Sequence, residues 1–180
     1  MKPDLFVKGC RVVKPDAVVS CGLAVRDGGV VAVLCPGETV DARREIDAGG
    51  RYVLPGLDDT HIHLGNAAQP FAADCATESR HAAAGGVTTM FVFVITRGSY
   101  LDALPELRRA AAAGSVVDMA FHAIIIREAQ IAEITRMAAE FGVRSFKTFM
   151  AYKGREISPS GIQGMGDAEW ASVEHVLVNA

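Results

Sequence analysis

The chain has 180 residues, half of them hydrophobic and 22% charged, with a formal net charge of −3. This composition is typical of a globular protein with a substantial core, and the slight acidic excess argues against a nucleic-acid-binding surface. Apolar runs such as residues 90–95 are too short to span a membrane, and the N-terminus lacks a signal-peptide pattern. The four cysteines show no C-x-x-C spacing. We therefore expect reduced thiols in a cytoplasmic protein without membrane or nucleic-acid partners.

Residues 1–52 are expected to form an N-terminal domain of short strands. Segments rich in β-forming residues alternate there with turn residues such as Gly28-Gly29 and Pro36-Gly37. This alternation is typical of hairpins in a small β-sandwich or an open sheet. The expected strands cover residues 4–8, 11–13, 17–25, 30–34 and 45–47.

Residues 53–180 are expected to form a second domain, in which strands alternate with helices. A strand over residues 53–63 precedes a helix over residues 71–84, which stops at Gly85-Gly86. Asp167 fits the N-cap of a last helix. Further strands are expected at residues 88–95, 116–126 and 145–150. Further helices are expected around residues 101–111 and 131–141, from apolar residues at helical spacing.

Four successive βα units predict an α/β fold with a parallel sheet. A doubly wound sheet is disfavoured, because the first strand ends in His63-Leu64-Gly65 and not in a glycine-rich phosphate-binding turn. A (β/α)₈ TIM barrel places functional groups at the C-terminal ends of its strands and takes roughly 250 residues in all. The prediction is therefore a partial TIM barrel, its first four βα units, preceded by a small β-sandwich domain.

The strand over residues 53–63 ends in two histidines, His61 and His63. Residues two apart in a strand point to the same face, so the two imidazoles suit a single metal ion. Lys147 lies within another apolar strand, where loss of hydration favours the neutral amine. A neutral amine can capture carbon dioxide as a carbamate, whose two oxygens can bridge two divalent cations.

Histidine nitrogens combined with oxygen ligands suit Zn²⁺, the kind of divalent cation that such a carbamate can bridge. A water molecule bridging such metals would be acidified and would attack a carbonyl carbon that the metals polarise. Tyr152, just beyond the strand of Lys147, is the candidate donor to the developing oxyanion. His122, within the third strand of this domain, is expected to be a hydrogen-bonded core histidine.

These residues resemble the motifs of a known family. The run P-G-L-D-D-T-H-I-H at residues 55–63 resembles the first-strand motif of the cyclic amidohydrolases, and A-G-G-V-T-T at 84–89 is similar to the beginning of their second strand. The run S-F-K-T-F-M-A-Y-K at 145–153 is similar to the signature of the dihydropyrimidinase and hydantoinase branch. The resemblance covers almost the whole chain and identifies it as the N-terminal portion of such an enzyme.

The resemblance implies that His61 and His63 bind one zinc, that carboxylated Lys147 bridges two zinc ions, and that Tyr152 contacts the substrate carbonyl. The implied substrate is a small cyclic amide, a hydantoin or a dihydropyrimidine, and the implied assembly is a homo-oligomer, a tetramer or a dimer. Allantoinase and dihydroorotase activities are alternatives within the same class. Dihydroorotases usually carry arginine where this chain has Gly65, which counts against that activity.

Two features depart from the family pattern. Asp58 stands where relatives have an apolar residue, and strict alternation would point it towards the helices. Asp59 would then share the face of the histidines and support a metal ligand. The family also takes two further histidines and an aspartate from later strands, so these 180 residues are expected to be inactive alone. A non-catalytic family member and a half-barrel that serves assembly are the alternatives from other functional classes.

Overall fold

The computed structural model of this chain describes residues 2–65, 70–149, 156–157 and 162–163. Tyr152, Asp167 and the expected last helix lie outside these residues. The chain divides into two compact units, Met1–Pro55 and Gly56–Ala180. The strand Tyr52–Val53 pairs with the N-terminal sheet and therefore belongs to the first unit.

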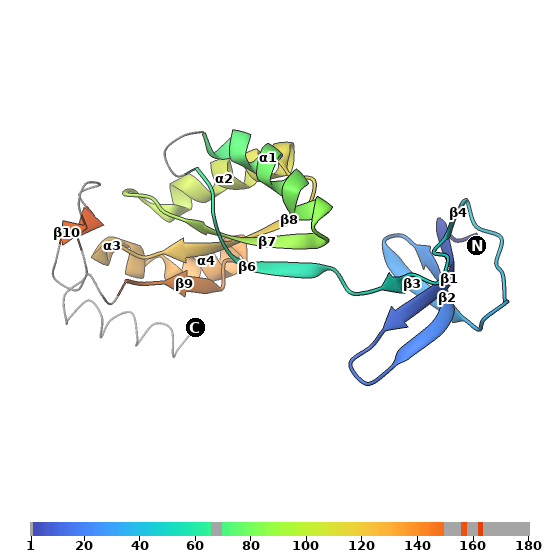
Figure 1. The fold of residues 1–180 in the computed structure, drawn as a ribbon. Coiled ribbons are helices and arrows are strands. Elements are labelled where there is room, and N and C mark those ends of the chain that lie inside the picture. Colours follow the sequence, from blue (N-terminus) through green and yellow to red (C-terminus); the bar gives the residue numbers. More distant parts are fainter. Residues whose placement is uncertain (1, 66–69, 150–155, 158–161, 164–180) are drawn as a thin grey trace. The chain divides into compact units, whose positions relative to one another are not determined.

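The first unit contains one five-stranded sheet (Figure 1). The sheet order is β3-β2-β1-β4, and β5 also pairs with β1. Strands β1, β2 and β3 are antiparallel neighbours, whereas β4 and β5 run parallel to β1. The strands are β1 (Leu5–Val13), β2 (Val18–Arg26), β3 (Gly29–Leu34), β4 (Arg44–Asp47) and β5 (Tyr52–Val53).

The expected β-sandwich is not formed within the described part of this unit. A sandwich needs two facing sheets, and here β4 and β5 add to the edge of β1 instead of folding back over the sheet. Two expected strands, residues 4–8 and 11–13, are one strand, because Gly9 (φ 59°) continues the chain through a register shift. Asp27 and Gly28 also have positive φ, as a two-residue hairpin turn requires.

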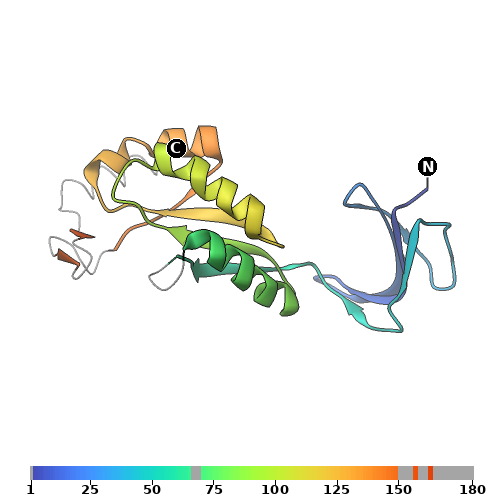
Figure 2. The ribbon, with the colours of Figure 1, turned by 90° about the horizontal axis from the view of Figure 1, so that it is seen from above.

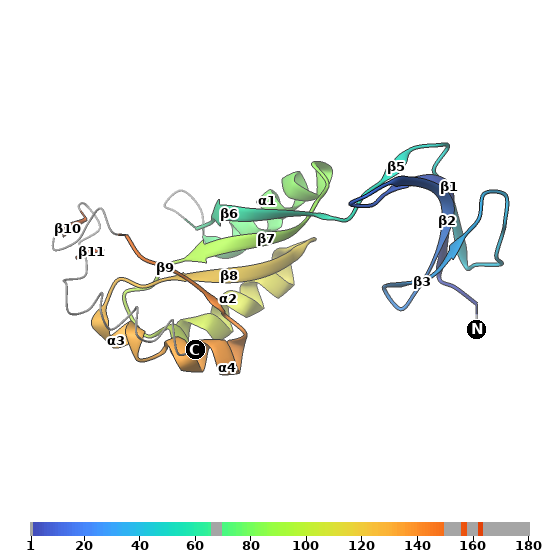
Figure 3. The ribbon, with the colours of Figure 1, turned by 90° about the horizontal axis from the view of Figure 1, so that it is seen from below.

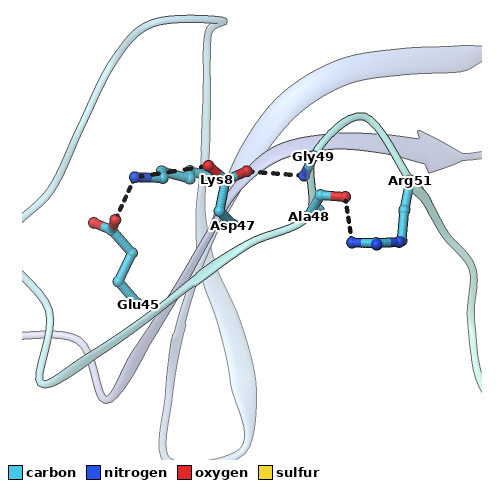
Figure 4. A network of polar contacts seen from close by, with 6 residues as sticks. All are labelled: Lys8, Glu45, Asp47, Ala48, Gly49 and Arg51. Atoms are coloured by element: carbon cyan, nitrogen blue, oxygen red, sulfur yellow. Dashed lines mark hydrogen bonds and ion pairs between the residues drawn. The ribbon is translucent and has the colours of Figure 1, made fainter.

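A polar network joins β1 to β4 and to the turn that follows (Figure 4). The Nζ atom of Lys8 lies 2.6 Å from a carboxylate oxygen of Glu45 and 3.9 Å from one of Asp47. Asp47 also accepts a hydrogen bond of 2.8 Å from the backbone N–H of Gly49. The neighbouring Glu45 raises the pKa of Lys8. Because these groups are exposed, the network adds little to the stability of the unit.

The second unit is a half-barrel of four parallel strands in chain order, β6-β7-β8-β9. Its helices cover one face of the sheet, as Figures 2 and 3 show from opposite sides. The strands are β6 (Leu57–His63), β7 (Val87–Val94), β8 (Asp118–Ile124) and β9 (Ser145–Lys147). The helices are α1 (Phe71–Ala84), α2 (Tyr100–Gly114), α3 (Glu128–Ile131) and α4 (Ile134–Phe141).

The core of this unit lies between the sheet and the helices. Alternate residues of the central strands, such as Met90, Val92 and Ala123, are completely buried there. They belong to one hydrophobic cluster that includes Cys75, Tyr100, Leu104, Ile134 and Met137 of the helices. The residues between them along each strand therefore face the other side of the sheet.

Three elements differ from the sequence-based expectation. The helix expected around residues 131–141 is divided into α3 and α4, and α4 ends at Gly142 in the left-handed conformation (φ 67°). The first strand of the half-barrel begins at Leu57 and not at residue 53. A short hairpin of β10 (Glu156–Ile157) and β11 (Ile162–Gln163) was not expected. Within the described ranges, no helix is long and apolar enough to cross a membrane.

Candidate metal centre

His61 and His63 lie at the C-terminal end of β6. Their ring centroids are 5.5 Å apart. Both rings contact the ring of Phe93 on the neighbouring strand β7, with centroid distances of 4.5 Å for His61 and 5.1 Å for His63. The structure therefore brings the two imidazoles together on one phenyl ring.

Lys147 is the last residue of β9, and its side chain is partly buried. The Lys147 Nζ atom lies 4.2 Å from the centroid of the Phe93 ring and 5.0 Å from that of Phe149. Strand β8 lies between β7 and β9. The side chain of Lys147 must therefore extend across β8, towards the ring on which His61 and His63 also pack.

His122 completes this cluster, and its role was missed by the sequence reasoning. It faces away from the helices, because its neighbours Phe121 and Ala123 are buried in the helix-side core. Its ring stacks on Phe93 at 4.6 Å and on Phe91 at 5.3 Å. The expected hydrogen bond is not formed with regular geometry among the described residues, although the backbone of Thr60 lies near the ring. Alternation between two buried apolar neighbours was the signal that could have identified it.

Burial, helped by nearby charges, favours the neutral imidazole at His63 and His122. Burial lowers the pKa of His63, and the positive charges of Lys147 and His61 lower it further. Burial also lowers the pKa of His122; the Thr60 backbone opposes this shift, and the charges of His61 and Lys147 reinforce it. A neutral imidazole keeps a nitrogen lone pair, which is the form that binds a metal ion.

The strand that carries the histidines is irregular at this point. Its register with β7 shifts between Leu57 and Asp58 and again between Asp59 and Ile62. The second shift puts one extra residue on β6 next to the histidines, as a β-bulge does. The Asp59 carboxylate accepts a hydrogen bond of 3.0 Å from the backbone N–H of His61. Asp59 thus contacts the histidine segment through the backbone.

These shifts correct the expectation for the two aspartates. Strict alternation would point Asp58 towards the helices and Asp59 towards the histidines. In the observed register Asp58 is paired with Thr89, and Asp59 with Met90, a residue of the helix-side core. Asp58 is exposed to solvent. The irregular strand therefore spares its carboxylate the cost of burial without a partner.

The donor set fits part of a zinc site. His61 and His63 supply two adjacent nitrogen donors, whereas a zinc site takes four ligands or three ligands and a water molecule. Across the part of the chain that the structure describes, no three His, Cys, Asp or Glu side chains are close enough to hold a metal ion. A carbamate on Lys147 would add oxygen donors next to Phe93. Tyr152, the fourth predicted site residue, lies outside the described residues.

Similar proteins are found by sequence, although no family model matches the chain. An L-hydantoinase of Paenarthrobacter aurescens is 34% identical over 172 residues, which cover 92% of this chain and 34% of that protein. A dihydropyrimidinase of Rattus norvegicus is 34% identical over 83% of this chain and 31% of its own length. An allantoinase of Solibacter usitatus is 33% identical over 84% of this chain and 33% of its own length. The chain thus spans about a third of these relatives.

Solved structures are similar over the same extent. An L-hydantoinase from Arthrobacter aurescens superimposes with a TM-score of 0.78 at 30% identity, over 94% of this chain and 37% of that one. A D-hydantoinase superimposes with a TM-score of 0.81 at 27% identity, over 98% of this chain and 38% of that one.

Proposed function

Because this chain belongs to the hydantoinase and dihydropyrimidinase family, we propose that it forms the metal-binding part of a hydrolase that opens a cyclic amide. Its substrate in this proposal is a hydantoin or a dihydropyrimidine. One observation carries the proposal: Lys147 extends across β8 to the phenyl ring that also contacts His61 and His63. Three residues of the predicted ligand types thereby surround Phe93.

In this proposal His61 and His63 hold a zinc ion through their neutral rings. Bound zinc would polarise the amide carbonyl and acidify a water molecule. The protein's part is to keep both imidazoles side by side and free of protons, which the lowered pKa of His63 favours. Asp59 supports the arrangement by fixing the backbone of His61. Tyr152 is proposed to donate its hydroxyl to the substrate carbonyl.

Lys147 is proposed to react with carbon dioxide. The lone pair of its neutral amine attacks the carbon of CO₂, a C–N bond forms, one C–O π bond becomes a carboxylate oxygen, and the nitrogen loses a proton. The resulting carbamate offers two oxygens, the donors needed to bridge two zinc ions. Lys147 is partly buried at the end of β9, and its Nζ atom lies 4.2 Å from the centre of the Phe93 ring that His61 and His63 also contact.

The chain alone offers only part of such a site, since the described residues lack a complete ligand set. We propose that ring opening requires ligands from a longer chain, as the coverage of the relatives suggests. We also propose a homo-oligomer. A non-catalytic relative with a role in assembly is the alternative from another functional class, and it predicts that no metal binds.

The test uses the full chain with any residues encoded beyond residue 180. Zinc content is measured by elemental analysis, and ring opening is measured with hydantoin, dihydrouracil and allantoin. We expect near-stoichiometric zinc and hydrolysis of at least one ring, both abolished in the variant His61→Asn/His63→Asn. His81→Asn is the matched control, because His81 is an exposed residue of helix α1. A folded protein without zinc and without hydrolysis would contradict the proposal, whereas allantoin as the preferred ring would establish the allantoinase alternative.

A further inference from the structure

His122 is the most unusual polar residue of the half-barrel. Both of its ring nitrogens are shielded from solvent, and within the described residues neither has a hydrogen-bond partner. Burying such a group without a partner is unfavourable, because it loses its hydrogen bonds to water. Leucine or phenylalanine would stack on Phe91 and Phe93 without this cost. The position of this imidazole therefore calls for a polar partner that the described residues do not supply.

The row of residues across the sheet shows where that partner would lie. Across the four neighbouring strands, His63 is paired with Phe93, Phe93 with His122, and His122 with Ser145. Lys147 follows Ser145 by two residues, on the same face of β9. The side chain of Lys147 has to cross β8 to reach Phe93, and His122 is the residue of β8 that stacks on this same ring. The Nζ atom of Lys147 and the ring of His122 thus both contact the ring of Phe93.

We infer that His122 is a positioning residue that donates a ring N–H to the carbamate of Lys147. This inference rests on the proposed function, because it requires the lysine to be carboxylated. A neutral imidazole has one N–H donor, and the carbamate carries two acceptor oxygens with a negative charge. A hydrogen bond to a charged acceptor is about twice as strong as a neutral one. The bond would hold the carbamate in a fixed orientation while its oxygens remain available to a metal ion.

The test measures the modification itself. The full chain is loaded with zinc, equilibrated with ¹³C-labelled bicarbonate and examined by ¹³C NMR for a lysine carbamate, which the Lys147→Ala variant should lack. His122→Phe retains the ring stack but removes the donor. We expect it to raise the bicarbonate concentration needed for half-modification by about tenfold to a hundredfold, as the loss of a charge-assisted hydrogen bond does. His81→Phe, on the exposed side of α1, is the control and should match the wild type.

Conservative variants separate positioning from folding. His122→Asn and His122→Gln each place an amide N–H donor near one of the two ring nitrogens, so at least one should restore most of the modification. A melting curve for each variant shows whether the protein is folded. If His122→Phe is unfolded, the histidine ¹⁵N spectrum of the wild type decides: the His122 N–H signal should shift when bicarbonate is removed.

Two failures remain distinguishable. A wild-type protein with no labelled carbamate would overturn the assignment of Lys147 and, with it, this inference. A wild-type protein that is modified, with a folded His122→Phe variant modified equally well, would overturn this inference and leave the proposed function intact. An unchanged His122 ¹⁵N signal on bicarbonate removal would likewise overturn it.

Discussion

The Nζ atom of Lys147 lies 4.2 Å from the centre of the Phe93 ring, although strand β8 separates the strands of these two residues. The same ring contacts three imidazoles, those of His61, His63 and His122. Phe93 is thus the residue that all the candidate ligands contact.

We expect Phe93→Leu to weaken zinc binding about tenfold, the lower end of the effect seen when a group that orients metal ligands is lost. Leucine keeps an apolar side chain of similar size but removes the flat surface that contacts the imidazoles. Competition with a chelator measures the affinity. Phe71→Leu is the control, because the Phe71 ring packs on Phe121 in the core between the sheet and the helices. Equal weakening in both variants would show that Phe93 has no special role.

Tyr100 links the C-terminal ends of two strands. Its buried hydroxyl oxygen lies 2.9 Å from the carbonyl oxygen of Val94 and 2.6 Å from that of Ile124. Tyr100→Phe should lower the free energy of unfolding by about 1–3 kcal/mol, because both carbonyls lose this donor. Urea denaturation measures the change. Tyr52→Phe, at a residue that is 54% exposed, should be close to neutral.

The Tyr100 hydroxyl should also make the free energy of unfolding depend on pH. Burial raises the pKa of Tyr100 above its ordinary value of 10.0. Above about pH 10 the unfolded chain releases this proton while the folded chain keeps it, so the unfolded state binds fewer protons and stability falls as the pH rises. Below pH 10 the contribution is complete. Between pH 9 and pH 11 the free energy of unfolding should therefore fall more for the wild type than for Tyr100→Phe. If it falls equally in both proteins, the Tyr100 hydroxyl is not the cause.

Gln130 forms hydrogen bonds with the segment that follows β7 and with the segment that follows β8. Its buried amide donates to the carbonyl oxygens of Thr96 (2.8 Å) and Gly98 (2.9 Å) and accepts from the N–H of Ile126 (3.0 Å). Gln130→Glu should destabilise the fold by about 2–4 kcal/mol at pH 7, since a carboxylate cannot donate to two carbonyls and is itself buried. Part of this loss should be recovered at pH 4, where the side chain gains a proton. Glu128→Gln, at an exposed neighbour, is the control.

Gly56 is required for a close approach to β7. A Cβ atom at this residue would lie 2.7 Å from the Cβ of Thr88, well inside normal contact. Gly56→Ala should cost about 1–3 kcal/mol, as overpacking does. Gly98→Ala is the control in the same unit, because its Cβ would meet Thr96 at an ordinary 3.8 Å. Equal melting temperatures for the two variants would contradict this account.

Hydrophobic periodicity predicted much of the half-barrel. Helix α1 has the predicted bounds, residues 71–84, because its apolar spacing ends at a glycine pair. The break between α3 and α4 could not be predicted, since apolar residues continue through it. In the structure Glu133, at the break, accepts a hydrogen bond of 2.7 Å from the backbone N–H of Tyr100. A contact with a residue so distant in sequence overrides the local helical pattern.

The site residues were predictable to different degrees. The i, i+2 spacing of His61 and His63 follows directly from strand geometry. The positions of Asp58 and Asp59 cannot be derived in this way. They depend on register shifts between β6 and β7, and the sequence of β6 alone does not reveal such shifts. The position of His122 follows from strand alternation, because the burial of Phe121 and Ala123 among the helices leaves the opposite face of β8 to it.

The parallel pairing of β9 with β8 also bears on how the molecule folds. Lys147 reaches the cluster only when β9 has paired with β8, and the segment between these two strands has to form α3 and α4. The histidine pair on β6 does not depend on this pairing. Uptake of a metal during refolding should therefore occur in two kinetic phases, and the rate of the slower phase would be the rate at which β9 pairs with β8.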